Sequence, residues 1–194
     1  MKPTRQRLIK LVMPVLVLFF VTIGIALYQT VAQVNAVEAQ RSRVAVSAAM
    51  EAMVTRISDY AHDNAYWDDA ARAVYETPVD RVFLETTWGA TTAEQIFADA
   101  AIIMEPNGKI LVAFRQGRQE DIRLSPKTLP ALTRLKKVIG RDNRAASTMV
   151  NEGGRIVIVA VAPIRPMSPK LRGLVPTSGP AQLILLHQIG RAHV

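Results

Sequence analysis

The sequence predicts an α+β protein in which an N-terminal transmembrane helix continues into a long helix, followed by an antiparallel sheet of about five strands. Three features predict this class: an uncharged apolar run near the N-terminus, a long helical pattern after it, and short β-prone runs separated by turns in the second half of the chain. Once the anchor is set aside, about 150 residues remain, which is enough for one domain with a hydrophobic core.

The run from Leu11 to Tyr28 contains no charged residue and would span about 27 Å as a helix, close to the thickness of a bilayer. It predicts a transmembrane helix over residues 11–28. The cations before it place residues 1–10 in the cytoplasm and the rest of the chain on the other side of the membrane; they are Lys2, Arg5, Arg7 and Lys10. A cleaved signal peptide is the alternative, because Val34 and Ala36 fit a small-residue cleavage rule, although the apolar run exceeds a typical signal core of about 7 to 15 residues.

No proline or glycine occurs between Thr30 and Tyr75, which predicts one uninterrupted helix. Its apolar residues recur at alternating spacings of three and four, which places them on one face; they are Val46, Met50, Met53, Ile57, Tyr60, Trp67, Ala71 and Val74. Asn64 lies on the same face, where a buried amide would need a partner. Such a helix can pair with its copy in a homodimer or cover its own domain, and both can hold.

Two short helices are predicted next. The first is capped by Thr77 and ended by Gly89, and the second is opened by a capping box at Thr91 and runs through Ile96. Ser125 opens a third helix, whose apolar face is closed by Gly140; that face consists of Leu129, Leu132, Leu135 and Ile139.

The strands are predicted from β-prone runs that flank glycine turns. Residues 100–104 and 109–114 surround the turn EPNG and form a first hairpin. Residues 148–150 and 155–164 surround Gly153 and Gly154 and form a second hairpin, whose second strand is apolar enough to be central. A loop rich in proline follows from Pro163 to Pro180, and residues 183–187 supply the last strand.

The net charge of +8 is unevenly distributed along the chain. Residues 38–105 contain 12 acids and 5 bases, whereas residues 106–194 contain 15 bases and 4 acids. The basic part has Phe114 as its single aromatic residue, which argues against nucleic-acid binding by stacking. It can contact an anionic ligand or lipid, or it can be a solvated surface. With no cysteine in the chain, disulfides, thiolate metal sites and cysteine nucleophiles are excluded.

The stretch from Asp59 to Tyr75 concentrates aromatic and acidic residues. With the order of elements from about residue 30 to 188, it resembles the CHASE4 family; the resemblance rests on Asp59, Tyr60, Ala61, Tyr66, Trp67, Asp68 and Asp69. This resemblance implies an extracytoplasmic sensor domain over residues 29–188, with a PAS-like, Cache-type fold. It also implies a cytoplasmic output domain, most often a diguanylate cyclase, a cyclic-di-GMP phosphodiesterase or both, and otherwise a histidine kinase. None of their catalytic motifs is present in the sequence, so this segment is expected not to be an enzyme.

The resemblance raises the expectation of an unknown small-molecule ligand. Tyr66, Trp67, Tyr75 and Trp88 can line a small pocket together with Asp68, because ligand sites combine aromatic walls with a few polar groups. Trp67 lies on the apolar face of the helix, where a tryptophan is more often a core residue than the wall of a ligand site.

Neither a metal site nor a catalytic site is expected, and no cofactor is implied. His62 and its acidic neighbours include a single imidazole and are better explained as a solvated helix flank. Asp63 and Asp68 lie five residues apart on one predicted helix and point to different faces, so they do not form an acid–base pair. A periplasmic hydrolase is therefore a weak alternative.

The C-terminal residues IGRAHV resemble the translation of a common sequencing adapter. Residues 189–194 are therefore expected to be artefactual, with the natural receptor continuing into a second membrane helix. If this C-terminus is natural, the alternative is a single-pass, membrane-tethered structural or interaction protein.

Overall fold

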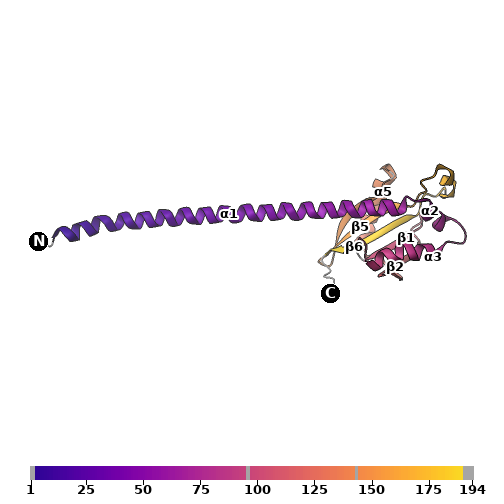
Figure 1. Ribbon diagram of the computed structural model, residues 1–194, viewed down its shortest axis with the longest axis horizontal. Helices are drawn as coiled ribbons and strands as arrows, with labels where there is room; N and C mark the ends of the chain where they lie inside the picture. Colours follow the sequence, from indigo (N-terminus) through magenta and orange to yellow (C-terminus); the bar gives the residue numbers. More distant parts are fainter. Residues whose placement is uncertain (1–2, 95–96, 143, 190–194) are drawn as a thin grey trace. The chain divides into compact units, whose positions relative to one another are not determined.

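The computed structural model describes residues 3–94, 97–142 and 144–189 (Figure 1). The chain divides into two compact units, residues 1–50 and residues 51–194. Two expectations fall partly outside the described residues: the short helix through Ile96, and the artefactual segment 189–194, of which only Ile189 is described.

The first unit is formed by helix α1, which runs from Pro3 to Ala65 and so extends into the second unit. Between residues 13 and 49 every side chain is exposed, including Leu18 and Phe20. Among the described residues, α1 is the one helix that is long and apolar enough to cross a membrane. An N-terminal signal sequence meets the same criterion. Pro14 lies inside α1.

The predicted single helix to Tyr75 is wrong, because α1 ends at Ala65 and a second helix, α2, spans Asp68–Tyr75. Trp67 between them has an extended backbone, with φ −153° and ψ 139°. Among residues 13–65 of α1, the buried ones are Ile57, Ala61 and Ala65, whereas Met53 on the predicted face remains 40% exposed. Asn64 needs no partner from another helix, since its Nδ2 donates to the carbonyl of Tyr60 at 2.9 Å.

The next helical segment is continuous, whereas two separate helices were predicted. It consists of α3 (Arg81–Leu84), a π-helical turn η1 (Glu85–Gly89) and α4 (Ala90–Glu94). Asp80 caps its start by accepting from the backbone N–H of Phe83 at 3.0 Å, so the predicted cap at Thr77 is wrong.

Gly89 does not end this segment but allows it to approach β2, because a Cβ there would lie 3.3 Å from the Phe114 ring. The predicted capping box at Thr91 is also wrong: its hydroxyl donates back to the carbonyl of Thr87 at 2.9 Å. A serine or threonine that bonds to the preceding turn is compatible with a helix interior.

The predicted α+β fold with a PAS-like antiparallel sheet is confirmed. The strands are β1 (Ala100–Met104), β2 (Ile110–Arg115), β3 (Arg118–Gln119), β4 (Ala146–Glu152), β5 (Arg155–Pro163) and β6 (Gln182–Ile189). They form one sheet in the order β3-β2-β1-β6-β5-β4, with every neighbouring pair antiparallel. The sheet has six strands where about five were predicted, because the two-residue strand β3 extends the edge beside β2.

Both predicted hairpins are present, and their turns require glycine. Gly108 in the first turn has φ +90°, and Gly153 and Gly154 in the second have φ +62° and +88°. These left-handed conformations are strained for residues with a Cβ, which is why the glycines mark the turns in the sequence.

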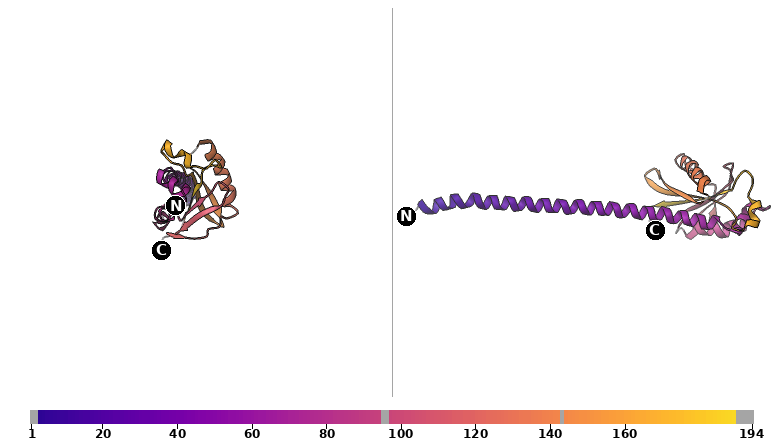
Figure 2. Two further views of the ribbon diagram at one scale, coloured as in Figure 1. Left: turned by 90° about the vertical axis from the view of Figure 1, so that its right-hand side faces the viewer. Right: turned by 90° about the horizontal axis from the view of Figure 1, so that it is seen from above.

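Both faces of the sheet are buried, so the second unit has three layers (Figure 2). Residues 51–65 of α1, α2 and the α3–η1 segment cover one face, where Ile57, Leu84 and Trp88 join Leu183 and Leu185 in one core. Helix α5 (Thr128–Asp142) covers the other face, over Ile102, Val159 and Ile184. A sheet covered on both sides requires strands that are apolar throughout, which explains the sequence of β5.

The apolar face of α5 differs from the prediction at both ends. Leu129 is half-exposed, and Ala131 is buried beside Leu132. Gly140 lies inside the helix rather than closing it. At the N-terminus the backbone N–H of Thr128 donates to the Ser125 hydroxyl at 3.1 Å, as expected for the predicted cap. The hydroxyls of both residues donate to Glu152, and these hydrogen bonds lower the pKa of its carboxyl.

Candidate functional site: a cavity lined by arginines

The end of α1 is fixed by a strand-like contact with the segment after β5. Tyr66 forms a parallel bridge with Arg165. The backbone N–H of Arg165 donates to the carbonyl of Ala65 at 3.0 Å, and the N–H of Trp67 donates to the carbonyl of Arg165 at 3.1 Å. These two hydrogen bonds take the place of further helical turns, and they hold the main chain of Arg165 against the end of α1.

A cavity of about 670 Å³, which we call the arginine pocket, lies at this junction. Its polar lining comes from both sides of the junction. His62 lies in the last turn of α1, and Tyr66 directly follows the helix. Arg144 precedes β4, Arg165 follows β5, and Arg172 lies in the loop between β5 and β6. The rings of His62 and Tyr66 are stacked, with centroids 5.5 Å apart and an interplanar angle of 9°. The volume lies within the range of about 300 to 1,000 Å³ that is usual for sites of small ligands.

The opposite wall is the proline-rich loop predicted between Pro163 and Pro180. It contains the 3₁₀ helix η2 (Pro169–Leu174), which carries Arg172. Pro166, Pro176 and Pro180 line the pocket together with Gly179, whose φ of +110° suits glycine. Because proline restricts the backbone, this wall has few conformations to lose when a ligand binds.

Two side chains of α2 fasten the loop to the helical layer. The Asp68 carboxylate accepts from the backbone N–H of Ser168 at 2.8 Å. The Tyr75 hydroxyl donates to the carbonyl of Ile164 and accepts from the N–H of Ala181, both at 2.8 Å. Burial raises the pKa of Tyr75 to about 12, although the hydrogen bond from Ala181 and the charge of Arg165 act in the other direction.

The lining of the arginine pocket includes three arginines, of which Arg144 and Arg172 are exposed and Arg165 is partly buried, and it includes no carboxylate residue. Within the part of the chain that the structure describes, none of Arg144, Arg165 and Arg172 forms a salt bridge. The Nε atom of Arg165 is buried and has no hydrogen-bond partner among the described residues. Three arginines without a carboxylate in the lining give the pocket an unmet capacity to bind negative charge.

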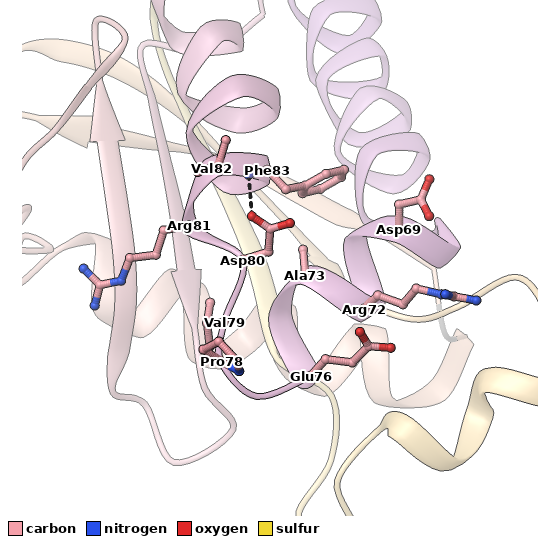
Figure 3. Close-up of a pocket in the computed structure, with 10 residues that line it drawn as sticks. All are labelled: Asp69, Arg72, Ala73, Glu76, Pro78, Val79, Asp80, Arg81, Val82 and Phe83. Carbon is pink, nitrogen blue, oxygen red and sulfur yellow. Dashed lines mark hydrogen bonds between the residues drawn. The ribbon is translucent and has the colours of Figure 1, made fainter.

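A second cavity, of about 750 Å³, lies between α2 and α3 (Figure 3). Its charged residues are of both signs: Asp69, Glu76 and Asp80 against Arg72 and Arg81. Asp80 is already engaged as the cap of α3, and Figure 3 shows Arg81 directed away from the other charged groups. This cavity therefore offers no convergent set of charges, and the arginine pocket is the better candidate.

The structure places the five residues predicted for ligand binding in different surroundings. Tyr66 lines the arginine pocket, whereas Asp68 and Tyr75 hold the loop that forms its wall. Trp67 is half-exposed and packs against Phe83, with ring centroids 5.4 Å apart. Trp88 is buried in the core between the helices and the sheet.

The sequence reasoning did not single out Arg144, Arg165 or Arg172. The sequence feature that contains them is the strong excess of bases after residue 105. This excess is compatible with an anionic-ligand site and with a solvated surface. The three residues are separated by strands and loops, and only the folded chain brings them to one cavity.

The acidic residues near this pocket form no catalytic or metal-binding arrangement. Asp63 is exposed on α1, and Asp68 is hydrogen-bonded to the loop. Among the described residues, no group of three or more histidine, cysteine, aspartate or glutamate side chains is arranged to hold a metal ion.

Comparison with protein families matches residues 49–189 to the family described as CHASE4 domain. A search of curated proteins finds no match. The matched segment covers the second unit as far as residue 189 and includes all six strands of the sheet.

Proposed function

Because the chain belongs to the CHASE4 domain family, whose members are sensor domains of bacterial signalling proteins, we propose that it is the ligand-sensing input domain of a membrane-bound signal transduction receptor. The observation that carries the proposal is the position of the arginine pocket at the end of α1, the helix that also contains the candidate membrane span. A sensor domain is not catalytic, so this segment receives the signal and the chemistry of the response lies elsewhere.

The pocket can couple a ligand to α1 through His62, which lies in its last turn, and Tyr66, which directly follows it. A ligand that contacts these residues together with Arg172 would bridge α1 and the proline-rich loop. It would then stabilise one arrangement of α1 and the loop over another. The size of this shift is limited by the difference between the ligand's affinities for the two arrangements. Because α1 is continuous from Pro3 to Ala65, a shift of its end can be passed along the helix.

The proposed receptor lies in the bacterial inner membrane, with residues 29–188 in the periplasm and residues 1–10 in the cytoplasm. The basic residues before the apolar run support this orientation. The proposed output is the synthesis or degradation of cyclic-di-GMP by a cytoplasmic domain, with a histidine kinase as the alternative output.

We further propose that two copies of the chain associate along α1 to form a homodimer. Val37 and Val44 support this, because they are exposed, seven residues apart and therefore on one face of the helix. A helix in water gains most of its stability from packing, which a second copy would provide.

The dimer predicts a periodic pattern of disulfide cross-linking in membranes. The chain contains no cysteine, so single substitutions report without background. We expect Val37→Cys and Val44→Cys to form cross-linked dimers on mild oxidation. The matched controls Asn35→Cys and Ser42→Cys, on the opposite face of α1, should cross-link poorly. Equal cross-linking at all four positions, measured by non-reducing electrophoresis, would contradict the dimer.

Signal transfer is tested with a hybrid receptor, in which residues 1–188 precede a second membrane helix and a diguanylate cyclase. Alanines inserted after Gln40 rotate one part of α1 against the other by about 100° per residue. We expect the cellular cyclic-di-GMP level to change with one to three inserted residues and to return toward the starting level with seven, since seven residues restore the helical phase to within about 20°. An unchanged level in all variants would instead favour a membrane-tethered structural protein.

A further inference from the structure

We infer that the arginine pocket binds a small soluble anion through carboxylate or phosphate oxygens. The inference that this anion is the sensed ligand rests on the proposed function, whereas the binding site itself rests on the geometry of the pocket.

The first argument is the convergence of like charges. Arg144, Arg165 and Arg172 line one cavity, and its lining contains no carboxylate. Guanidinium groups stay charged at all physiological pH values, so their mutual repulsion is not relieved by losing a proton. An anion between them would turn this repulsion into attraction, and the planar guanidinium matches the paired oxygens of carboxylate and phosphate.

The second argument is the environment of Arg165. Its main chain is held by hydrogen bonds to Ala65 and Trp67, so the base of its side chain has a fixed position. Its Nε is buried without a hydrogen-bond partner in the described ranges. Because this Nε is closed to the cavity, an anion oxygen would bond to the terminal nitrogens of Arg165, which are not among the buried atoms without a partner.

The shape of the pocket favours a small organic ligand over a membrane surface. The arginines line an indented cavity of about 670 Å³ rather than a flat patch. Pro166, Pro176 and Val175 supply apolar walls beside the charges. The stacked rings of His62 and Tyr66 add a flat surface of the kind that packs on the carbon skeleton of a metabolite.

The test measures binding to the full chain in non-ionic detergent micelles by isothermal titration calorimetry at constant ionic strength. Succinate and inorganic phosphate are the two anionic probes, and succinamide is the neutral counterpart of succinate. We expect saturable binding of at least one anion and none of succinamide. Binding of succinate alone identifies the carboxylate chemistry, and binding of phosphate alone identifies the phosphate chemistry.

The variants assign the binding to the pocket. Arg144→Gln and Arg172→Gln should each weaken the affinity at least tenfold, which corresponds to about 1.4 kcal/mol. Arg155→Gln removes the same charge from an exposed position at the start of β5 and should leave the affinity within about twofold. Unchanged tryptophan fluorescence would show that each variant is folded.

Two results would overturn the inference: no saturable binding of either anion, or an equal loss in Arg155→Gln and the pocket variants. The hybrid receptor separates this outcome from failure of the proposed function, because the insertions in α1 need no ligand. A hybrid that responds to the insertions while the purified chain binds no anion would retain the sensor function and reject the anion.

Discussion

Replacing Ile57 with alanine is expected to lower the free energy of unfolding of the second unit by about 3 kcal/mol, within the usual range for removing a large aliphatic side chain from a core. Ile57 is 1% exposed and belongs to the core between α1 and the sheet. Within residues 51–65, the part of α1 in the second unit, the other buried residues are Ala61 and Ala65, and both are small. Ile57 is therefore the largest buried side chain of this part of α1, and its loss leaves a cavity that alanines cannot fill.

Urea unfolding followed by tryptophan fluorescence measures this effect, because Trp67 and Trp88, the only tryptophans of the chain, both lie in the second unit. The matched control is Val82→Ala, at a position that is 72% exposed on α3. It should change the free energy of unfolding by less than about 0.5 kcal/mol. Equal effects of the two substitutions would show that α1 does not pack on the sheet through Ile57.

The second large effect is expected from Tyr75→Phe, which should lower the free energy of unfolding by about 2 kcal/mol. The substitution keeps the ring but removes the hydroxyl that joins Ile164 and Ala181. Both of those residues are buried, so the N–H of Ala181 would lose its acceptor without gaining water. The loop that forms one wall of the arginine pocket should loosen as well, and its amide hydrogen exchange should become faster.

The same hydroxyl predicts a pH dependence. The pKa of Tyr75 is raised from 10.0 to about 12 on folding, mainly by burial. A raised pKa means that its contribution to stability is complete below pH 10 and is lost as the pH rises through about 12. The stability difference between the original chain and Tyr75→Phe should therefore shrink over this interval. The comparison cancels the titration of the lysines, which are common to both chains. A difference in the free energy of unfolding that stays constant up to pH 12 would contradict a buried Tyr75 hydroxyl.

Much of the fold was predictable because it depends on local chemistry. The glycines at 108, 153 and 154 permit left-handed turns, and they define both hairpins in the sequence as they do in the structure. The apolar run of β5 indicated a strand covered on both faces, as the two cores around it confirm. The match of residues 49–189 to the CHASE4 domain agrees with the resemblance that began with the stretch from Asp59 to Tyr75.

Other features could not be predicted because they depend on residues that are distant in sequence. Nothing in the sequence around Ala65 breaks a helix, and α1 ends there because the backbone of Arg165 offers competing hydrogen bonds. Gly89 resembled a helix terminator, yet its role is to let η1 approach the ring of Phe114. Local propensity is a weak prior that tertiary contacts override in both places.

Local patterns were enough to predict the α+β class, the apolar N-terminal helix, the hairpins and the family, since periodicity, turn residues and a compact motif can be read from neighbouring residues. The grouping of charges in one cavity depends instead on the folded chain. Arg144, Arg165 and Arg172 were indistinguishable in the sequence from the other bases of the C-terminal half. Antiparallel pairing of β4, β5 and β6 brings the segments before β4, after β5 and before β6 to the end of α1. The hydrogen bond between the N–H of Ala181 and the Tyr75 hydroxyl holds the last of these segments there. Contacts between distant segments therefore create the pocket, and these contacts cannot be predicted from the residues that neighbour each arginine in the sequence.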